Sequence, residues 1–260
     1  MNRVRADITQ TPLPDESLQG RPFDLPDDVA HYLRDVRRLD VGAAGELFDG
    51  TGRVLRGKLQ QVTDHGVAVF VEEDTTDTST ESPCEVTLLP VMPKRKRWRW
   101  VIEKATELGV RRIEPLTSDH AVVDIPDDRV ASKLERWQKI LGSAARQSER
   151  AVTPTISAPI SLEDRLEDYT PEGLAVAPAA RSDGPSLDSI LSESDASGSD
   201  APGAVDLWVG PEGGFSDGEL QAMESRDITL CRLGPRILRA ETAAVAAITT
   251  IQTRLGDLGV

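Results

Sequence analysis

Apolar residues in the last two thirds of the chain form short continuous runs that are separated by segments with helical spacing. The runs are typical of buried strands and lie at 84–92, 112–118, 174–180, 207–210 and 229–234. The helical spacing predicts helices at 98–108, 130–148, 216–225 and 239–256. Because strands that alternate with helices form a parallel sheet covered on both faces, the pattern predicts an α/β domain over 84–260.

The first 75 residues follow a different pattern. Apolar and polar residues alternate at 45–62 and 65–73, as in strands, and one helix is expected at 27–39. Asp49-Gly50 and Thr51-Gly52 suit a tight hairpin, since glycine accepts positive φ. The acidic stretch 72–83 lacks periodicity and is the predicted linker. The sequence therefore predicts a small β-barrel-like domain over 1–75.

Composition limits the possible classes of protein. No run of eighteen apolar residues is present, so no membrane span is expected. The first residues, MNRVRADITQ, lack the apolar core of a signal peptide. Cys84 and Cys231 are the only cysteines, and neither a disulfide framework nor a metal site follows from two isolated residues. We therefore expect a cytoplasmic protein without a metal.

The formal net charge of −14 argues against nucleic-acid binding, because phosphate repels an acidic surface. Two details soften this objection: Arg far outnumbers Lys among the 30 basic residues, and much of the acid lies in 72–81, 124–128 and 183–200. In addition, one dense basic cluster begins at Lys94, and Trp98 and Trp100 are interleaved with its cations. Such a cluster suits phosphate contact combined with base stacking. A solvated helix start is the alternative, although cations are unfavourable at that helix end. The residues predicted to bind RNA are Lys94, Arg95, Arg97 and Arg99.

A glycine-rich turn, GPEGGFSDGEL (210–220), follows the strand that ends at Val209. Ser216 and Glu219 have the spacing of a capping box at the start of the next helix. Gly213 and Gly214 allow a ligand to approach the backbone closely, and ligands of α/β sheets bind at the carboxyl ends of strands. An ordinary connecting loop is the alternative. The segment lacks the Lys-Ser/Thr pair of a phosphate-binding P-loop.

A second segment, LGPRILRAETAAVAAI (233–248), leads from a strand into an alanine-rich helix. Arg236, Arg239 and Glu241 stand together at the junction, where burying such charges is costly. These residues either serve a reaction or form a structural Arg–Glu pair. The three histidines, His31, His65 and His120, are scattered, so no zinc site or nucleophile triad is indicated.

KATELGV (104–110), GPEGGFS and LGPRILRAETA, taken together in this order, resemble the distinctive motifs of one enzyme family. These are the RsmE-type uridine-N3 methyltransferases of 16S (small-subunit) ribosomal RNA, in the SPOUT superfamily. HYLRDVRRLDVGAAGELFDGTG (31–52) is similar to the family's N-terminal domain. The resemblance implies a PUA-like RNA-binding barrel, a deep trefoil knot in the α/β domain and a homodimer. It also implies S-adenosylmethionine as cofactor and small-subunit ribosomal RNA, within a ribosomal particle, as substrate.

The chain departs from the family pattern in several places. His120 stands in SDHAVV where the family reads close to TERSVV. Arg146 and Glu149 stand in RQSERAVTP where the family has EQSGR, and Pro178-Ala179 stands where it often has His or Glu. The insertion around 192–203 is longer than usual. We expect these departures to affect RNA contacts more than cofactor binding.

Methylation at N3 of uracil requires the base to be oriented, its developing anion stabilised and its proton removed. Arg239 is the candidate for anion stabilisation. Glu241 is expected to orient Arg239 or to accept the proton, and Glu212 is the alternative base. Cofactor contacts are expected from Gly210, Pro211, Glu212, Gly213 and Gly214 in one loop, and from Leu233, Gly234, Ile237, Leu238, Arg239 and Thr242 in the other. The alternative function is a catalytically inactive RNA-binding protein with a degenerate knot domain.

Overall fold

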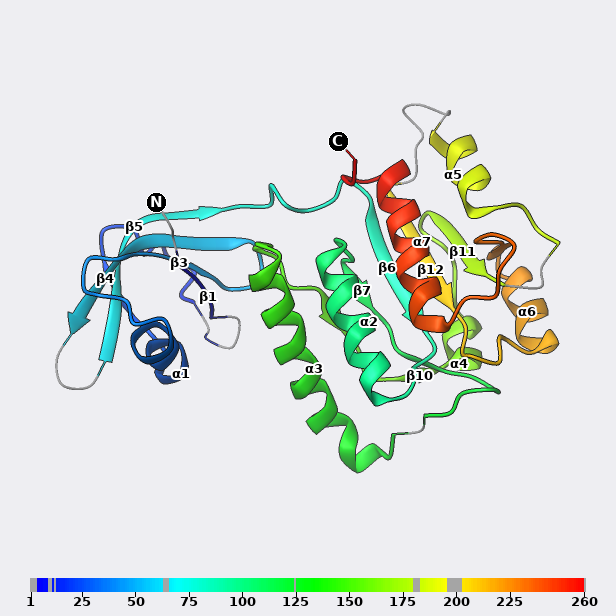
Figure 1. The fold of residues 1–260 in the computed structure, drawn as a ribbon, viewed down its shortest axis with the longest axis horizontal. Coiled ribbons are helices and arrows are strands. Elements are labelled where there is room, and N and C mark those ends of the chain that lie inside the picture. The colour runs from blue at the N-terminus through cyan, green and yellow to red at the C-terminus, as the bar shows by residue number, and fades with distance from the viewer. Residues whose placement is uncertain are drawn as a thin grey trace. The chain divides into compact units, whose positions relative to one another are not determined.

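A computed structural model describes residues 4–8, 11, 13–62, 66–123, 125–179, 183–195 and 203–259 (Figure 1). The chain forms two compact units. One comprises Met1–Glu81 together with Gly142–Thr153, and the other comprises Ser82–Leu141 together with Pro154–Val260. The first unit thus extends beyond residue 75, where the sequence pattern ends the first domain, and takes in a segment from the middle of the chain.

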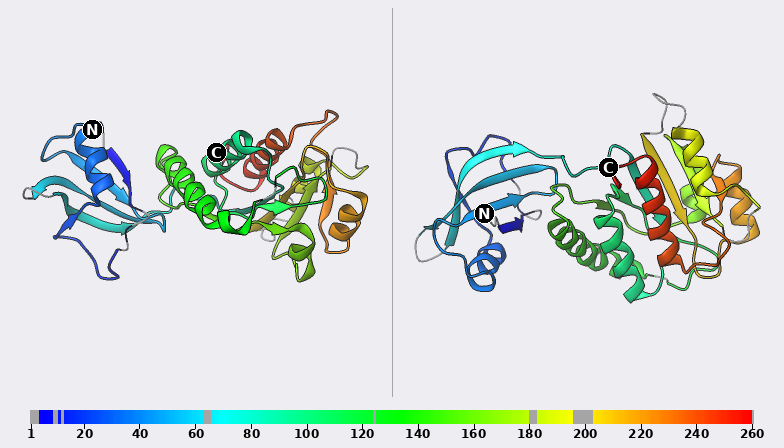
Figure 2. Two further views of the ribbon diagram at one scale, coloured as in Figure 1. Left: turned by 90° about the horizontal axis from the view of Figure 1, so that it is seen from below. Right: turned by 45° about the horizontal axis from the view of Figure 1, so that its top comes forward.

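The N-terminal unit is built on a five-stranded sheet (Figure 2). Its strand order is β1 (Val4–Asp7), β3 (Ala44–Phe48), β4 (Arg53–Val62), β5 (Gly66–Thr76) and β2 (Pro22–Asp24). β1 pairs with β3 in parallel, and the other pairs are antiparallel. The predicted helix at 27–39 is present as α1 (Asp27–His31) and the π-helical turn η1 (Tyr32–Val36). Leu47, Leu55 and Val69 are buried in the core between them.

The predicted hairpin between β3 and β4 is confirmed. Gly50 and Gly52 both have positive φ, at 80° and 105°. Asp49 closes the turn, because its Oδ1 accepts hydrogen bonds from the amide and the hydroxyl of Thr51.

The prediction of a linker at 72–83 is wrong for its first half, because β5 continues to Thr76. Acidic residues of this stretch face arginines on the neighbouring strand. Arg53 donates to both carboxylate oxygens of Asp74, at 2.9 and 2.8 Å. Arg56 binds Asp77 at 2.8 Å. The acidic composition therefore reflects cross-strand ion pairing, which periodicity alone does not reveal.

The C-terminal unit contains the predicted parallel sheet. Its order is β13 (Thr229–Cys231), β11 (Leu174–Pro178), β12 (Ala204–Val209), β6 (Glu85–Pro90), β7 (Arg112–Ile113) and β9 (Thr155–Ile156). The predicted strand at 112–118 is divided by Pro115, and its second part, β8 (Leu116–Thr117), pairs with β10 (Ile160–Ser161). β11, β12 and β13 thus end side by side, which brings three loops to one edge of the sheet.

Helices cover both faces of this sheet (Figures 1 and 2). One face packs against α2 (Arg95–Glu107), α3 (Asp127–Gln147), α5 (Leu187–Asp195) and α7 (Ala240–Arg254). The other face packs against α4 (Leu162–Glu167) and α6 (Asp217–Glu224). α2 begins three residues before the predicted start, and most of the predicted insertion at 192–203 lies outside the described residues. No helix within the described ranges is long and apolar enough to cross a membrane.

Candidate functional site

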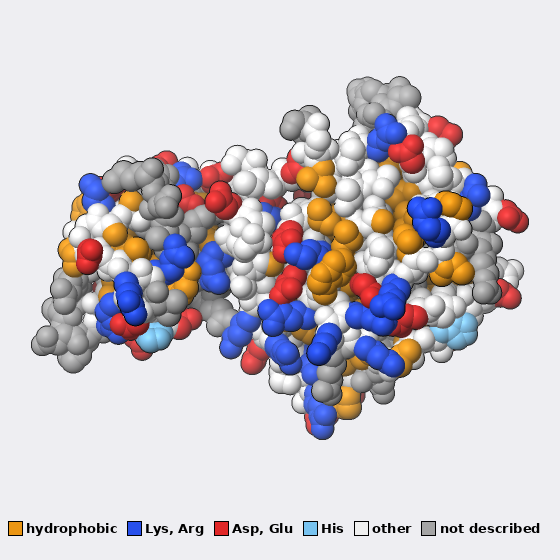
Figure 3. Space-filling view, viewed as in Figure 1, with side chains coloured by type: hydrophobic (Ala, Val, Ile, Leu, Met, Phe, Trp, Pro, Cys, Tyr) orange, Lys and Arg blue, Asp and Glu red, His pale blue; other side chains and the backbone are white. Residues whose placement is uncertain are grey.

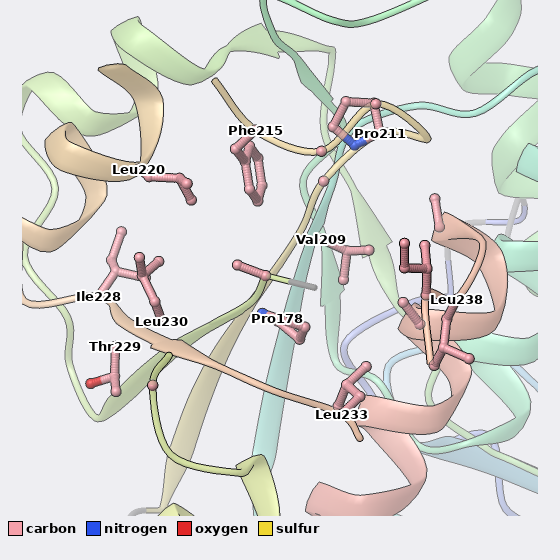
Figure 4. Close-up of a pocket in the computed structure, with 18 of the residues that line it drawn as sticks. Pro178, Val209, Pro211, Phe215, Leu220, Ile228, Thr229, Leu230, Leu233 and Leu238 are labelled. Carbon is pink, nitrogen blue, oxygen red and sulfur yellow. The ribbon is translucent and has the colours of Figure 1, made fainter. Parts of the chain in front are cut away.

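A cavity of about 1130 Å³ lies at the carboxyl ends of β11, β12 and β13 (Figure 4). Its walls come from three parts of the sequence: 178–179 with 183–185, residues within 209–224, and residues within 227–243. Val209, Leu233 and Leu238 gather around one part of the cavity, whereas Phe215 and Leu220 lie around another. This is the edge at which open parallel sheets bind ligands.

The glycine-rich turn at 210–214 forms one wall, and all five of its residues line the cavity. The predicted capping box is present, since Ser216 and Glu219 each bond to the other's backbone amide. Gly210 permits the tight turn, because a Cβ atom there would lie 3.2 Å from the ring of Phe215. The amide of Gly214 donates to the carbonyl of Pro211 at 2.9 Å, and Gly214 has a φ of 76°.

The segment after β8 supports this turn from behind. Asp119 donates its amide to Glu219 at 2.9 Å and accepts the hydroxyl of Ser216 at 2.7 Å. His120 Nδ1 lies 3.1 Å from the carbonyl oxygen of Gly214, and a Cβ atom on Gly213 would lie 3.3 Å from His120 Cβ. His120 therefore contacts the predicted cofactor loop, and the expectation that this departure affects RNA contacts more than cofactor binding stays a prediction.

The second predicted loop forms another wall. Leu233, Gly234, Ile237 and Leu238 line the cavity, and Gly234 has a φ of 132° with open space where a side chain would stand. Ile237 is 73% exposed. Arg239 and Thr242 are exposed and do not line the cavity, so nine of the eleven residues predicted to hold the cofactor come together around it.

Arg97 joins the two loops, a role that differs from its predicted role as an RNA contact. Its Nη1 pairs closely with Glu212 of the glycine-rich turn. Its Nε lies 3.3 Å from Glu241, in the first turn of α7. The guanidinium is thus engaged with two carboxylates, and the Arg97 side chain as a whole is 36% exposed.

Glu241 does not orient Arg239, which corrects the prediction for that pair. Arg239 is the N-cap residue of α7 and has an extended backbone, so its side chain is attached just before the first helical turn. The Glu241 side chain is 14% exposed and turns to Arg97 instead. Among the described residues Arg239 has no ion-pair partner, and it stands between Leu238 and Ala240, which both line the cavity.

Sequence reasoning missed the wall formed by 178–179, 183–185 and 228–230. Pro178, Ile228 and Leu230 are apolar residues at strand ends and carry no local sign of ligand contact. The described lining residues also carry a distinctive charge: five of them are carboxylates, and Arg236 is the one basic residue among them. These carboxylates belong to Asp183, Glu212, Asp217, Glu224 and Asp227. The cavity thus suits a ligand with an apolar body and a positive charge.

The other residues predicted to bind RNA lie at the start of α2. Lys94 is the exposed N-cap residue, and Arg99 is exposed and pairs with Glu103 at 2.7 Å. The backbone of Arg95 lies in the first helical turn, and its side chain is outside the described part of the structure. No group of three or more metal-ligating side chains occurs among the described residues.

Comparison with known proteins identifies relatives over most of the chain. The sequence model of the RNA methyltransferase domain family matches residues 80–252. Ribosomal RNA small subunit methyltransferase E of Synechocystis sp. is 35% identical, over 86% of this chain and 71% of that protein. The protein of the same name from Bacillus subtilis is 31% identical, over 90% of this chain and 91% of its own length.

Solved structures agree with the sequence relatives. Ribosomal RNA small subunit methyltransferase E of Neisseria gonorrhoeae, solved with S-adenosyl methionine, has a TM-score of 0.83 at 30% identity and covers 99% of this chain. A methyltransferase of Legionella pneumophila, solved with bound cofactor SAM, has a TM-score of 0.84 at 28% identity and also covers 99%. All of each solved chain is matched.

Proposed function

This chain belongs to the RNA methyltransferase family, and we propose that it transfers a methyl group from S-adenosylmethionine to N3 of a uridine in small-subunit ribosomal RNA. The observation that carries the proposal is the cavity at the carboxyl ends of β11, β12 and β13. Two loops with the family's motifs meet there and supply nine of the residues predicted to hold the cofactor.

The cavity fits this cofactor in size and charge. Its volume of about 1130 Å³ leaves enough room for a small-molecule ligand, since such sites usually have roughly 300–1,000 Å³. Leu233 and Leu238 offer apolar surface to an adenine ring, and glycines at 213, 214 and 234 leave backbone accessible. S-adenosylmethionine carries a sulfonium and an ammonium against one carboxylate, so a lining with five carboxylates matches its net positive charge.

The cofactor supplies an electrophilic methyl group, and the protein must make the uracil nitrogen nucleophilic. In the reaction the N3–methyl bond forms, the sulfur–methyl bond breaks with its electrons left on sulfur, and the N3 proton goes to a base. Arg239 is suited to stabilise the negative charge that develops on the uracil oxygens, because its guanidinium is exposed and has no ion-pair partner among the described residues.

Glu212 is the better candidate for the proton acceptor. Its side chain lines the cavity and is 30% exposed, so a substrate base can reach it. Both carboxylates pair with Arg97, but the Glu241 side chain is 14% exposed and Glu241 is not part of the cavity wall. We therefore assign Glu241 to holding Arg97 and, through it, Glu212 in place.

Several further properties are part of the proposal on the strength of the family resemblance. The N-terminal unit is a PUA-like domain that binds RNA, and the α/β unit contains a trefoil knot. The protein is a cytoplasmic homodimer that acts on ribosomal RNA within a ribosomal particle. Lys94, Arg95 and Arg99 contribute to RNA affinity at the start of α2.

Two measurements separate this function from the alternative of an inactive RNA-binding protein. Calorimetry should detect S-adenosylmethionine binding, and mass spectrometry should find 3-methyluridine in small-subunit RNA treated with the protein. Gly234→Val should abolish cofactor binding, because a branched side chain would enter the cavity. Gly42→Val is the matched control, since Gly42 also has positive φ and open space around it but lies outside the cavity. Binding of RNA without any cofactor binding by the unaltered chain would establish the inactive alternative.

A further inference from the structure

Charge is strongly segregated along this acidic chain. Segments 94–104 and 129–139 contain ten of the thirty Lys and Arg residues but two of the forty-four Asp and Glu residues. The first segment belongs to the start of α2, which the sequence pattern already singled out. The second lies in α3, where the four cations are spread over three helical turns and form no dense cluster in the sequence.

The fold places these two segments next to each other within the C-terminal unit. Trp98 of α2 and Trp137 of α3 pack edge to face, with ring centroids 5.5 Å apart. Both rings are buried, so the cations of the two helices are left on their outer faces. Figure 3 shows Lys and Arg side chains gathered over α2 and α3 on this side of the molecule.

These cations are available to a ligand. Five of them are exposed and make no ion pair with any residue that the structure describes: Lys94, Lys96, Arg129, Arg136 and Lys139. We call these five residues, together with Trp100, the helix surface. Arg97 is not part of it, since its guanidinium is engaged with Glu212 and Glu241.

Trp100 is the second feature that points to a nucleic acid. Its side chain is 39% exposed among the cations of α2, whereas Trp98, Trp137 and Trp208 are at most 5% exposed. An exposed aromatic ring between cations is the arrangement that holds single strands, with the ring stacking on a base and the cations contacting phosphates. A duplex offers no unstacked base to such a ring.

We propose that the helix surface binds a single-stranded segment of RNA. Phosphates lie along Arg129, Arg136 and Lys139 of α3, over about 15 Å of helix from 129 to 139, and one base stacks on Trp100. The proposal rests on the function proposed above, because it assigns to the RNA substrate a second contact region outside the cavity. A contact of this kind accounts for RNA binding by a chain whose net charge is −14.

The test measures binding of the full-length chain to a labelled single-stranded RNA oligonucleotide at several salt concentrations, with the matching duplex in parallel. The Arg129→Ala/Arg136→Ala variant should flatten the slope of log affinity against log salt by about 1.4, at roughly 0.7 per phosphate contact. Arg112→Ala/Arg254→Ala is the matched control, since both arginines are exposed in the same unit, and its slope should not change.

Tryptophan fluorescence tests the stacking contact directly, because the exposed ring is the one that RNA can quench. Single-stranded RNA should quench the tryptophan fluorescence of the native protein. Trp100→Leu should remove this quenching and weaken RNA binding on the order of tenfold. An unchanged salt slope for the α3 variant, or RNA binding without quenching, would overturn the proposal. So would a change in oligomeric state of the α3 variant with its RNA slope intact, since the surface would then join copies of the chain. Titration with the cofactor distinguishes these results from a failure of the proposed function. If the proposed function is wrong, the unaltered chain does not bind the cofactor; if only the helix surface is wrong, the unaltered chain and the variants all bind it.

Discussion

Arg97 offers the sharpest test of how this site is built, because its sequence context and its structure assign it different roles. Arg97→Met removes the positive charge while keeping a long side chain. Glu212 and Glu241 then lose their shared partner, and Glu241 Oε2 is already buried without a hydrogen-bond partner among the described residues. We expect the variant to be less stable and to bind the cofactor more weakly.

The magnitude follows from the burial of the three side chains. An exposed ion pair contributes about 0.2–1 kcal/mol, whereas removing one partner of a buried pair costs about 3–5 kcal/mol. Arg97 is 36% exposed, Glu212 30% and Glu241 14%, which places this pair between the two limits. A loss of about 1–2 kcal/mol is therefore expected, with a fall in melting temperature of about 2–4 °C per kcal/mol. If the same energy is lost from the ordering of the cavity loops, cofactor affinity falls about tenfold for each 1.4 kcal/mol.

Thermal unfolding and calorimetric titration of the cofactor measure both effects. Arg97→Lys should recover only part of the loss, because an ammonium group cannot span two carboxylates as a guanidinium fork does. Arg99→Met is the control, since Arg99 forms an exposed pair within α2. Parent stability and cofactor affinity in Arg97→Met, together with a flatter salt dependence of RNA binding, would show that Arg97 is a phosphate contact and that its pairing with the loops is incidental.

Three further predictions concern the reaction, the N-terminal unit and the thiols. Arg239→Lys should reduce single-turnover methyl transfer on the order of a hundredfold, as for one preorganised donor, and spare cofactor affinity; parent rates would make Arg239 structural. The hydrogen bonds from Arg53 lower the pKa of Asp74, so its stabilising effect is present above its ordinary pKa and is lost as pH falls through the lowered one. The melting temperatures of the parent and Asp74→Asn should therefore differ most near neutral pH and converge in acid, and a constant difference would contradict this. Burial raises the pKa of Cys84 to about 11 and that of Cys231 to about 12, so a thiol reagent at pH 8 should modify both only on unfolding.

The sequence predicts the parts of the fold that depend on local signals. Apolar runs at strand spacing, paired glycines at 50 and 52 and the capping box at Ser216 each depend on a few adjacent residues, and the structure contains all three. The linker prediction failed because the partners of the acidic stretch lie on another strand. Asp74 and Asp77 are each 21 residues away from the arginine that they bind.

The candidate site likewise has parts that adjacent residues reveal and parts that depend on residues distant in sequence. Its glycine loops are visible in the sequence, since glycines that follow a strand allow a ligand to approach the backbone, although an ordinary connecting loop has the same pattern. The third wall, at 178–179, 183–185 and 228–230, carries no sequence motif and becomes visible only when β11, β12 and β13 lie together. Arg97 and Glu212 are 115 residues apart, so a basic cluster and a glycine-rich turn give no sign of contact.

The two arginines near the reaction site, Arg97 and Arg239, show why residue type alone does not assign a role. Each lies within or beside a motif, and either could in principle face a uracil anion. The Arg97 guanidinium is already engaged by two carboxylates, so moving it to a substrate would leave Glu241 nearly buried without its cation. Arg239 is the residue just before α7, and within the described residues its side chain forms no ion pair that substrate binding would break. The free energy of breaking existing contacts therefore favours Arg239 as the residue that meets the substrate, and Arg97 as the one that holds the loops in place.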